Sequence, residues 1–152
     1  MAVQRGYLLD TNIVLHATRQ GSRFAQSVDA LFQLSTSRFR PAICEVTIAE
    51  LKAFALGWGS ARREKLTQVI QGMLVIQVAD AGVHERWAEL YSHARAKGLP
   101  IQQDHNDIWI AAASYVSGLQ LLSTDQKAFL PLRGSPWVDV QVLDPLTALP
   151  LP

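Results

Sequence analysis

The sequence predicts an α/β fold built around a mostly parallel sheet. Short apolar segments typical of strands alternate with longer segments in which apolar residues recur at helical spacing. This alternation indicates a parallel sheet, because a helix commonly connects one parallel strand to the next. Most of the strand segments are short apolar runs, as expected where helices cover both sides of the sheet.

Five segments are predicted to be strands. The fifth alternates valine with polar residues, and the other four are apolar runs. They are "GYLLD" at 6–10, "FRPAICEV" at 39–46, "LVIQV" at 74–78, "LQLLS" at 119–123 and "VDVQVLD" at 138–144. We therefore expect a sheet of about five strands.

The helical segments lie between these strands and carry recognisable start and stop signals. The segments are 24–34, 47–57, 60–73, 80–98 and 106–118. Ser60 is a plausible N-cap, and Thr47 and Glu50 have the spacing of a capping box. Gly57 and Gly98 are expected to end the helices that precede them. The segment 106–118 is rich in alanine and almost entirely apolar, so we expect a buried helix.

Length and composition favour a single globular domain. The chain has 152 residues, of which 49% are hydrophobic and 18% are charged. No internal repeat or low-complexity linker divides it. We expect one domain over residues 1–146 and an irregular, proline-rich tail over 147–152.

Several features favour a cytoplasmic protein that does not contact a membrane. No apolar run approaches the roughly 20 residues that span a bilayer. The N-terminal segment lacks the long apolar region and cleavage site of a secretory signal. Cys44 is the only cysteine, so no disulfide can form within the chain, as is usual in a reducing compartment.

Four carboxylates stand where a parallel sheet places its ligands, beyond the carboxyl ends of the strands. Asp10 and Asp125 follow the first and fourth predicted strands. Glu50 lies in the helix after the second strand, and Asp107 opens the alanine-rich helix.

Each acid also has a purely structural interpretation. Asp10 and Asp125 are suited to cap the helices that follow them, and Glu50 to complete the capping box with Thr47. Asp104 is suited to cap the helix in which Asp107 would be a first-turn acid stabilised by the helix dipole.

The four acids together are harder to explain by folding alone. Two like charges about 4 Å apart cost on the order of 4 kcal/mol at an effective dielectric constant of about 20. A divalent cation removes this repulsion, and an all-oxygen ligand set suits Mg²⁺ or Mn²⁺ rather than zinc. Such an ion activates water and stabilises charge on phosphate, which points to hydrolysis of phosphodiester bonds.

The segments "YLLDTN", "VTIAEL", "NDIWIAAA" and "LLSTD", in this order and spacing, resemble the PIN-domain ribonucleases. The resemblance is strongest to the VapC-type toxins of type II toxin–antitoxin systems, and it extends from about residue 6 to 144. It implies a three-layer α/β/α sandwich and endoribonuclease activity that depends on Mg²⁺, with Mn²⁺ able to substitute. It also implies an RNA substrate, a homodimer and a small antitoxin protein as partner.

The resemblance also assigns roles to individual residues. Asp10 and Asp107 would be the main metal ligands, and Glu50 and Asp125 would hold the metal directly or through water. The neighbours expected to support these catalytic residues by hydrogen bonds are Thr11, Asn12 and Thr124.

The sequence departs from the family pattern or leaves a choice at two points. Phe129 follows Asp125 at a spacing of four, where many relatives have three. Asp104 stands close enough to Asp107 to share the third acidic role.

A run of basic residues offers a possible RNA contact. The net charge is only +1, but Arg62, Arg63 and Lys65 lie close together in one predicted helix. They are candidates for RNA binding, and the alternative is an ordinary solvated helix surface.

Three other functions match parts of this sequence. An aspartyl phosphatase requires Asp-x-Asp-x-Thr after the first strand, whereas this chain has Asp10, Thr11 and Asn12. A receiver domain requires an early acidic pair, which is missing although Asp80 fits its middle position. A non-catalytic PIN-like module that binds RNA or protein remains the alternative to a nuclease, and the sequence does not identify the RNA.

Overall fold

The computed structural model describes residues 5–152, so the first four residues of the expected domain lie outside the described part. Its centre is a five-stranded sheet in the order β3-β2-β1-β4-β5, in which every neighbouring pair is parallel. The strands are β1 (Tyr7–Leu9), β2 (Ala42–Cys44), β3 (Leu74–Ile76), β4 (Gln120–Ser123) and β5 (Val140–Val142). The predicted number of strands and their parallel arrangement are confirmed.

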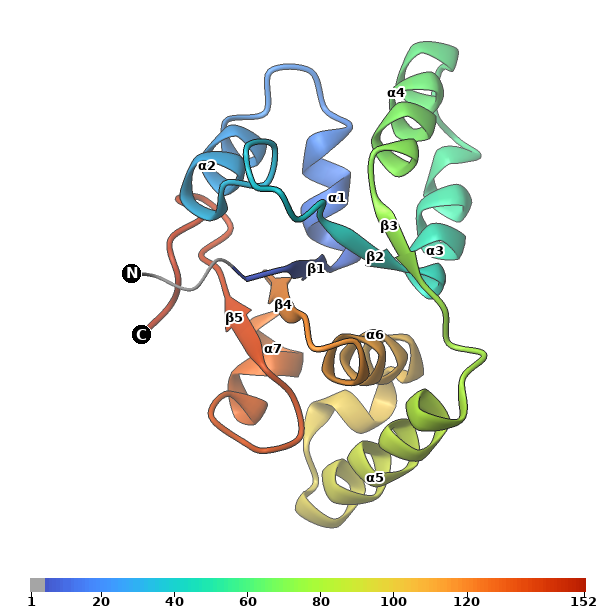
Figure 1. The fold of residues 1–152 in the computed structure, drawn as a ribbon, viewed down its shortest axis with the longest axis vertical. Coiled ribbons are helices and arrows are strands. Elements are labelled where there is room, and N and C mark those ends of the chain that lie inside the picture. The colour runs from blue at the N-terminus through green and yellow to red at the C-terminus, as the bar shows by residue number, and fades with distance from the viewer. Residues whose placement is uncertain (1–4) are drawn as a thin grey trace.

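Helices cover both faces of the sheet and form three layers (Figure 1). One face is covered by α1 (Thr11–Ala17), α2 (Arg23–Phe32), α3 (Glu45–Ala55) and α4 (Ser60–Gln71). The other is covered by α5 (Ala81–Lys97), α6 (His105–Val116) and α7 (Gln126–Phe129). Two short 3₁₀ helices, η1 (Pro100–Gln103) and η2 (Leu130–Leu132), connect elements on this second face. The three-layer α/β/α sandwich is therefore confirmed.

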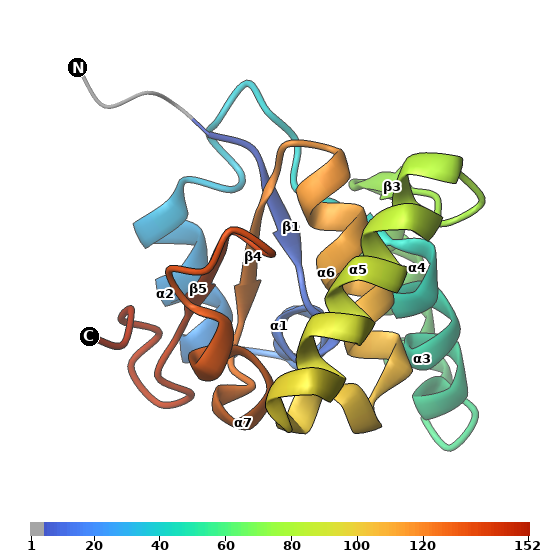
Figure 2. The same ribbon diagram turned by 90° about the horizontal axis from the view of Figure 1, so that it is seen from below.

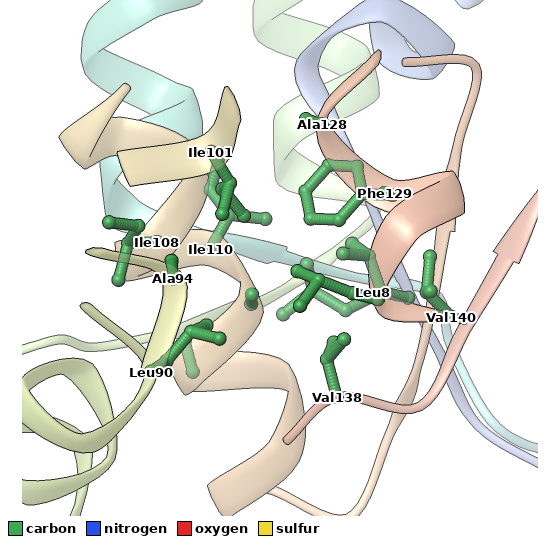
Figure 3. Packing of buried hydrophobic residues seen from close by; sticks show 14 of the residues in the cluster. Leu8, Leu90, Ala94, Ile101, Ile108, Ile110, Ala128, Phe129, Val138 and Val140 are labelled. Atoms are coloured by element: carbon green, nitrogen blue, oxygen red, sulfur yellow. The ribbon is translucent and has the colours of Figure 1, made fainter. Parts of the chain in front are cut away.

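The core consists of two clusters, one on each side of the sheet. Leu8 and Leu9 are adjacent in β1 but belong to different clusters, because successive side chains of a strand point to opposite faces. The cluster under α5, α6 and α7 includes Leu8, Leu90, Ile110 and Phe129 (Figure 3). Both faces of the central strands are thus buried, as their apolar sequences predict.

Two predicted helix caps are wrong. Helix α4 begins at Ser60 itself, and its N-cap is Gly59. Helix α3 begins at Glu45, directly after β2, with Cys44 as N-cap. Thr47 therefore lies within the first turn of α3, and the predicted capping box with Glu50 does not form. The reason is that β2 leads into α3 without a linker, so the helix starts two residues before the expected cap.

The C-terminal segment 147–152 contains no helix or strand but packs against the domain. The Leu151 backbone N–H donates to the Val142 carbonyl at 2.8 Å, and Leu143 and Pro150 form an isolated antiparallel bridge. Ala148 is fully buried in the core cluster under α1 and α2. The segment therefore covers part of the sheet at the β5 edge.

No helix in the part of the chain from residue 5 onward is long and apolar enough to cross a membrane.

The core assignment predicts a large difference between two leucine substitutions. Leu90 on α5 is 0% exposed, whereas Leu146 is 87% exposed. Leu90→Ala should lower the free energy of unfolding by about 2–5 kcal/mol, since it leaves a cavity in a packed core. Leu146→Ala should change it by less than about 0.5 kcal/mol. Urea unfolding of both variants checks this, and equal effects would contradict the described core.

Candidate active site

The centre of the candidate site is Asp10, which follows β1 at the point where the order of strands reverses. Figure 2 shows β1 and β4 side by side, pointing toward the end of the sheet where α1 and α7 begin. Asp10 is 3% exposed and is the N-cap of α1. Its Oδ1 accepts a hydrogen bond from the Thr11 backbone N–H at 2.8 Å. The capping role expected of Asp10 is thus confirmed, and it uses only one of the two carboxylate oxygens.

The second oxygen of Asp10 is held by the neighbouring strand. Ser123 Oγ donates to Asp10 Oδ2 at 2.6 Å. The pairing of Leu9 with Leu122 places Ser123, the last residue of β4, beside Asp10. Ser123 is fully buried, and the sequence analysis did not identify it as a site residue. The sequence did carry one signal for Ser123: it ends an apolar strand and precedes the candidate acid Asp125 by two residues.

Asp125 is tied to the same serine. Its backbone N–H donates to Ser123 Oγ at 3.0 Å, and its Oδ1 accepts from the Ala128 backbone N–H at 2.9 Å. Asp125 is the N-cap of α7, as its structural interpretation predicts. One buried hydroxyl therefore links the carboxylate after β1 with the residue that follows β4.

Glu50 reaches the same end of the sheet from α3. Thr11 Oγ1 donates to Glu50 Oε1 at 2.7 Å, and Asn106 Nδ2 donates to Glu50 Oε2 at 3.4 Å. Thr47 Oγ1 lies 3.3 Å from Thr11 Oγ1 and is fully buried. Glu50 is consequently held by α1 and by the first turn of α6, and not by the start of its own helix.

Asp104 and Asp107 have different surroundings. Asp104 is the N-cap of α6, and its Oδ1 accepts from the backbone N–H groups of Asn106 and Asp107 at 3.1 and 3.2 Å. Asp107 lies in the first turn and is partly buried. Its carboxylate accepts no hydrogen bond from the described residues. It is thus the acid with the most freedom to bind another group.

Two residues expected to support the site make no such contact. Asn12 is exposed, and neither its side chain nor that of Thr124 forms a hydrogen bond within residues 5–152. The expected support from Thr11 is seen in its bond to Glu50. The other side-chain hydrogen bonds to these acids come from Ser123 and Asn106, because the end of β4 and the start of α6 face the acids directly.

The acids raise one another's pKa. Burial raises the pKa of Asp10 to about 6, against hydrogen bonds from Ser123 and Thr11 that lower it, and the charges of Glu50 and Asp125 raise it further. Burial also raises the pKa of Asp107 to about 8, with further contributions from the charges of Asp10, Asp104, Asp125 and Glu50. Carboxylates from four separate segments therefore repel one another at one edge of the sheet.

A small cavity of about 250 Å³ opens beside these acids and is lined in part by Asp104, Asp107, Asp125 and Lys127. Its three acids offer carboxylate oxygens, which suit Mg²⁺ and Mn²⁺, whereas Asp10 and Glu50 do not line it. Among the described residues, no three His, Cys, Asp or Glu side chains already converge closely enough to hold an ion. The acids fit such a cation in chemistry and charge, and the Asp107 side chain is free to turn toward it.

The three basic candidates are not part of the acid cluster. Arg62, Arg63 and Lys65 all lie on α4. Arg62 and Lys65 line a second cavity, between α4 and the connection from α1 to α2, and Arg63 does not. The structure therefore separates Arg63 from its two neighbours.

Comparison with protein families matches residues 7–130 to the PIN domain. The match spans most of the chain and includes all four acids, so this chain belongs to the PIN domain family. A comparison with curated proteins found no match.

Solved structures support the same fold. The structure of VapBC2 from Rickettsia felis bound to promoter DNA is 23% identical, with a TM-score of 0.75, and the match covers 91% of this chain and 99% of that one. VapBC-1 from nontypeable Haemophilus influenzae is 19% identical, with a TM-score of 0.72 and coverage of 90% and 97%. FitAcB from Neisseria gonorrhoeae is 24% identical, with a TM-score of 0.64 and coverage of 88% and 95%.

The raised pKa of Asp107 predicts how stability changes with pH when EDTA removes divalent cations. The pKa is about 8 in the folded protein and near 3.9 in an unfolded chain, so the folded state binds the proton more tightly. The resulting stabilisation is complete below about pH 4 and is lost as the pH rises through about 8. Asp107→Asn removes this titration, so its melting temperature should rise relative to wild type between pH 5 and 9.

Thermal unfolding of both proteins across this range measures the effect. Asp144→Asn is a suitable comparison, because Asp144 lies outside the cluster and hydrogen bonds lower its pKa. If the melting temperatures of Asp107→Asn and wild type differed by the same amount at every pH, the raised pKa of Asp107 would be contradicted.

Proposed function

We propose that this protein is a metal-dependent endoribonuclease that uses Mg²⁺, or Mn²⁺ in its place, to hydrolyse RNA phosphodiester bonds. The observation that carries the proposal is that hydrogen bonds of Thr11 and Ser123 link Asp10, Glu50 and Asp125 at one end of the sheet. Asp107 lines a cavity there together with Asp125. Membership of the PIN domain family supports the same function. Folding alone requires no such concentration of negative charge, because a cap needs one acid and not its neighbours.

Asp10 and Asp107 are the proposed main metal ligands, with Glu50 and Asp125 binding directly or through water. A bound Mg²⁺ would supply an activated water and stabilise the negative charge that develops on the phosphate. Ser123 and the Thr11 backbone N–H fix the orientation of the Asp10 carboxylate. The Thr11 hydroxyl and the Asn106 amide do the same for Glu50. Such hydrogen bonds to ligands restrict their geometry before any ion binds.

We further propose that the protein is the toxin of a toxin–antitoxin pair. Its fold is like that of VapBC-5 from Mycobacterium tuberculosis, described as a member of the VapBC family of toxin–antitoxin systems, and like that of a toxin–antitoxin complex from Klebsiella pneumoniae. We also propose that the partner is a small antitoxin protein and that the chain forms a homodimer, as the resemblance of its sequence to the VapC-type toxins implies, and that it acts in the cytoplasm.

Cleavage of a mixed pool of single-stranded RNA tests the nuclease. Wild type should cut with Mg²⁺ or Mn²⁺ and not with EDTA. The Asp10→Asn/Asp107→Asn double variant should lose about a hundredfold or more of the rate, since it removes charges that hold the ion. Glu85→Gln is the matched control, because Glu85 is an exposed acid on α5, outside the cluster. Its rate should equal that of wild type.

The alternative, a PIN-like module that binds RNA without cutting it, predicts a different result. In that case folded wild-type protein binds RNA but does not cut it with either metal, and the double variant behaves like wild type. Equal cleavage by wild type and the double variant would instead indicate a contaminating nuclease.

A further inference from the structure

A cavity of about 810 Å³ lies between the α1–α2 connection and the first half of α4. The two segments that form it both lie at the upper edge of Figure 1. Three basic side chains, Arg19, Arg62 and Lys65, line this cavity, and no acidic side chain does. The concentration of positive charge favours an anionic ligand.

Arg62 is held in place without an acidic partner. Its guanidinium lies over the Trp58 ring, 3.7 Å from the ring centroid. Arg62 Nε and Nη2 both donate to Thr18 Oγ1 at 3.3 Å. Within residues 5–152, no carboxylate forms an ion pair with Arg62.

Thr18 is itself fixed by the fold. It is 3% exposed, and its hydroxyl donates to the Leu15 carbonyl at 2.7 Å. An aromatic ring and a buried hydroxyl therefore hold the guanidinium in one orientation, while the remaining N–H groups have no partner among the described residues. A planar, preoriented guanidinium binds phosphate with two parallel hydrogen bonds and loses little conformational entropy.

Helix α1 connects this cavity with the acid cluster. Thr11, at the start of α1, bonds to Glu50, and Thr18 is the C-cap of the same helix. The seven residues of α1 span about 10 Å, which a few nucleotides of single-stranded RNA can bridge. An RNA strand that enters a site with four acids requires cationic contacts nearby to offset the repulsion.

We propose that the cavity around Arg62 binds a backbone phosphate of the RNA substrate, a few nucleotides from the bond that is cut. This inference rests on the proposed ribonuclease function for the identity of the polyanion. Arg62 makes the directed contact, Trp58 and Thr18 position it, and Arg19 and Lys65 add positive charge. Arg63 has no part in this proposed site, because it does not line the cavity.

Binding of fluorescein-labelled single-stranded RNA of mixed sequence, measured by anisotropy in EDTA, tests the proposal. All variants are made in the Asp10→Asn/Asp107→Asn background so that the RNA is not cut. Arg62→Ala should weaken binding about tenfold or more, because a charge-assisted contact is lost. Arg63→Ala, with the same charge change on the same helix, should weaken it less than about threefold. Arg62→Lys should fall between them, since it keeps the charge but loses the planar fork.

The salt dependence separates a phosphate contact from a structural role. Arg62→Ala should lower the slope of log affinity against log salt by about 0.7, the value for one phosphate contact on a single strand. A lower melting temperature with unchanged RNA affinity and slope would make Arg62 purely structural and overturn the proposal. Equal losses in Arg62→Ala and Arg63→Ala would also overturn it.

The two proposals fail in distinguishable ways. If wild type cuts RNA but Arg62→Ala binds it normally, the cavity proposal is wrong and the nuclease stands. If Arg62→Ala loses RNA binding but wild type never cuts RNA, the phosphate site stands and the nuclease is wrong. Tighter wild-type binding of single-stranded DNA than of RNA of the same sequence would overturn the assignment to RNA.

Discussion

The whole site depends on the hydrogen bond from Ser123 to the buried carboxylate of Asp10. It joins the ends of β1 and β4, the two strands between which ligands bind in sheets of this topology. The same hydroxyl accepts the backbone N–H of Asp125, so the register of one strand pair positions two acids at once. Burial at this point disfavours the charged form of Asp10 and so raises its pKa. A bound cation would favour the charged form and offset this effect.

The structural and functional interpretations of the acids turn out to be compatible. Asp10, Asp104 and Asp125 all cap helices through one oxygen. A parallel sheet begins its helices at the edge where it binds ligands, so a cap at that edge also faces the site. Asp107 differs, since its carboxylate accepts no hydrogen bond from the described residues and its pKa is the most strongly raised of the cluster. Of these acids, Asp107 is therefore the one for which the fold offers the weakest structural role.

Much of the fold could be predicted from the sequence, because strand and helix periodicities are local signals. The buried helix α6 and the end of α5 at Gly98, where the backbone is left-handed, follow from such signals. Thr47 and Glu50 show where local signals fail. They have the spacing of a capping box, but Glu50 accepts a hydrogen bond from Thr11, which is distant in sequence. Ser123 and the Trp58–Arg62–Thr18 contacts were missed because they join residues far apart in sequence, and no local pattern reports such pairs.

The most direct test of the central claim is a crystal structure of the protein with Mn²⁺, examined for anomalous scattering from the ion. The account predicts a strong peak bounded by carboxylate oxygens of Asp10 and Asp107, with Glu50 and Asp125 at direct or water-mediated distance. A peak only at other acids, or none in crystals grown at saturating Mn²⁺ and near-neutral pH, would contradict the claim that these four carboxylates form a metal site.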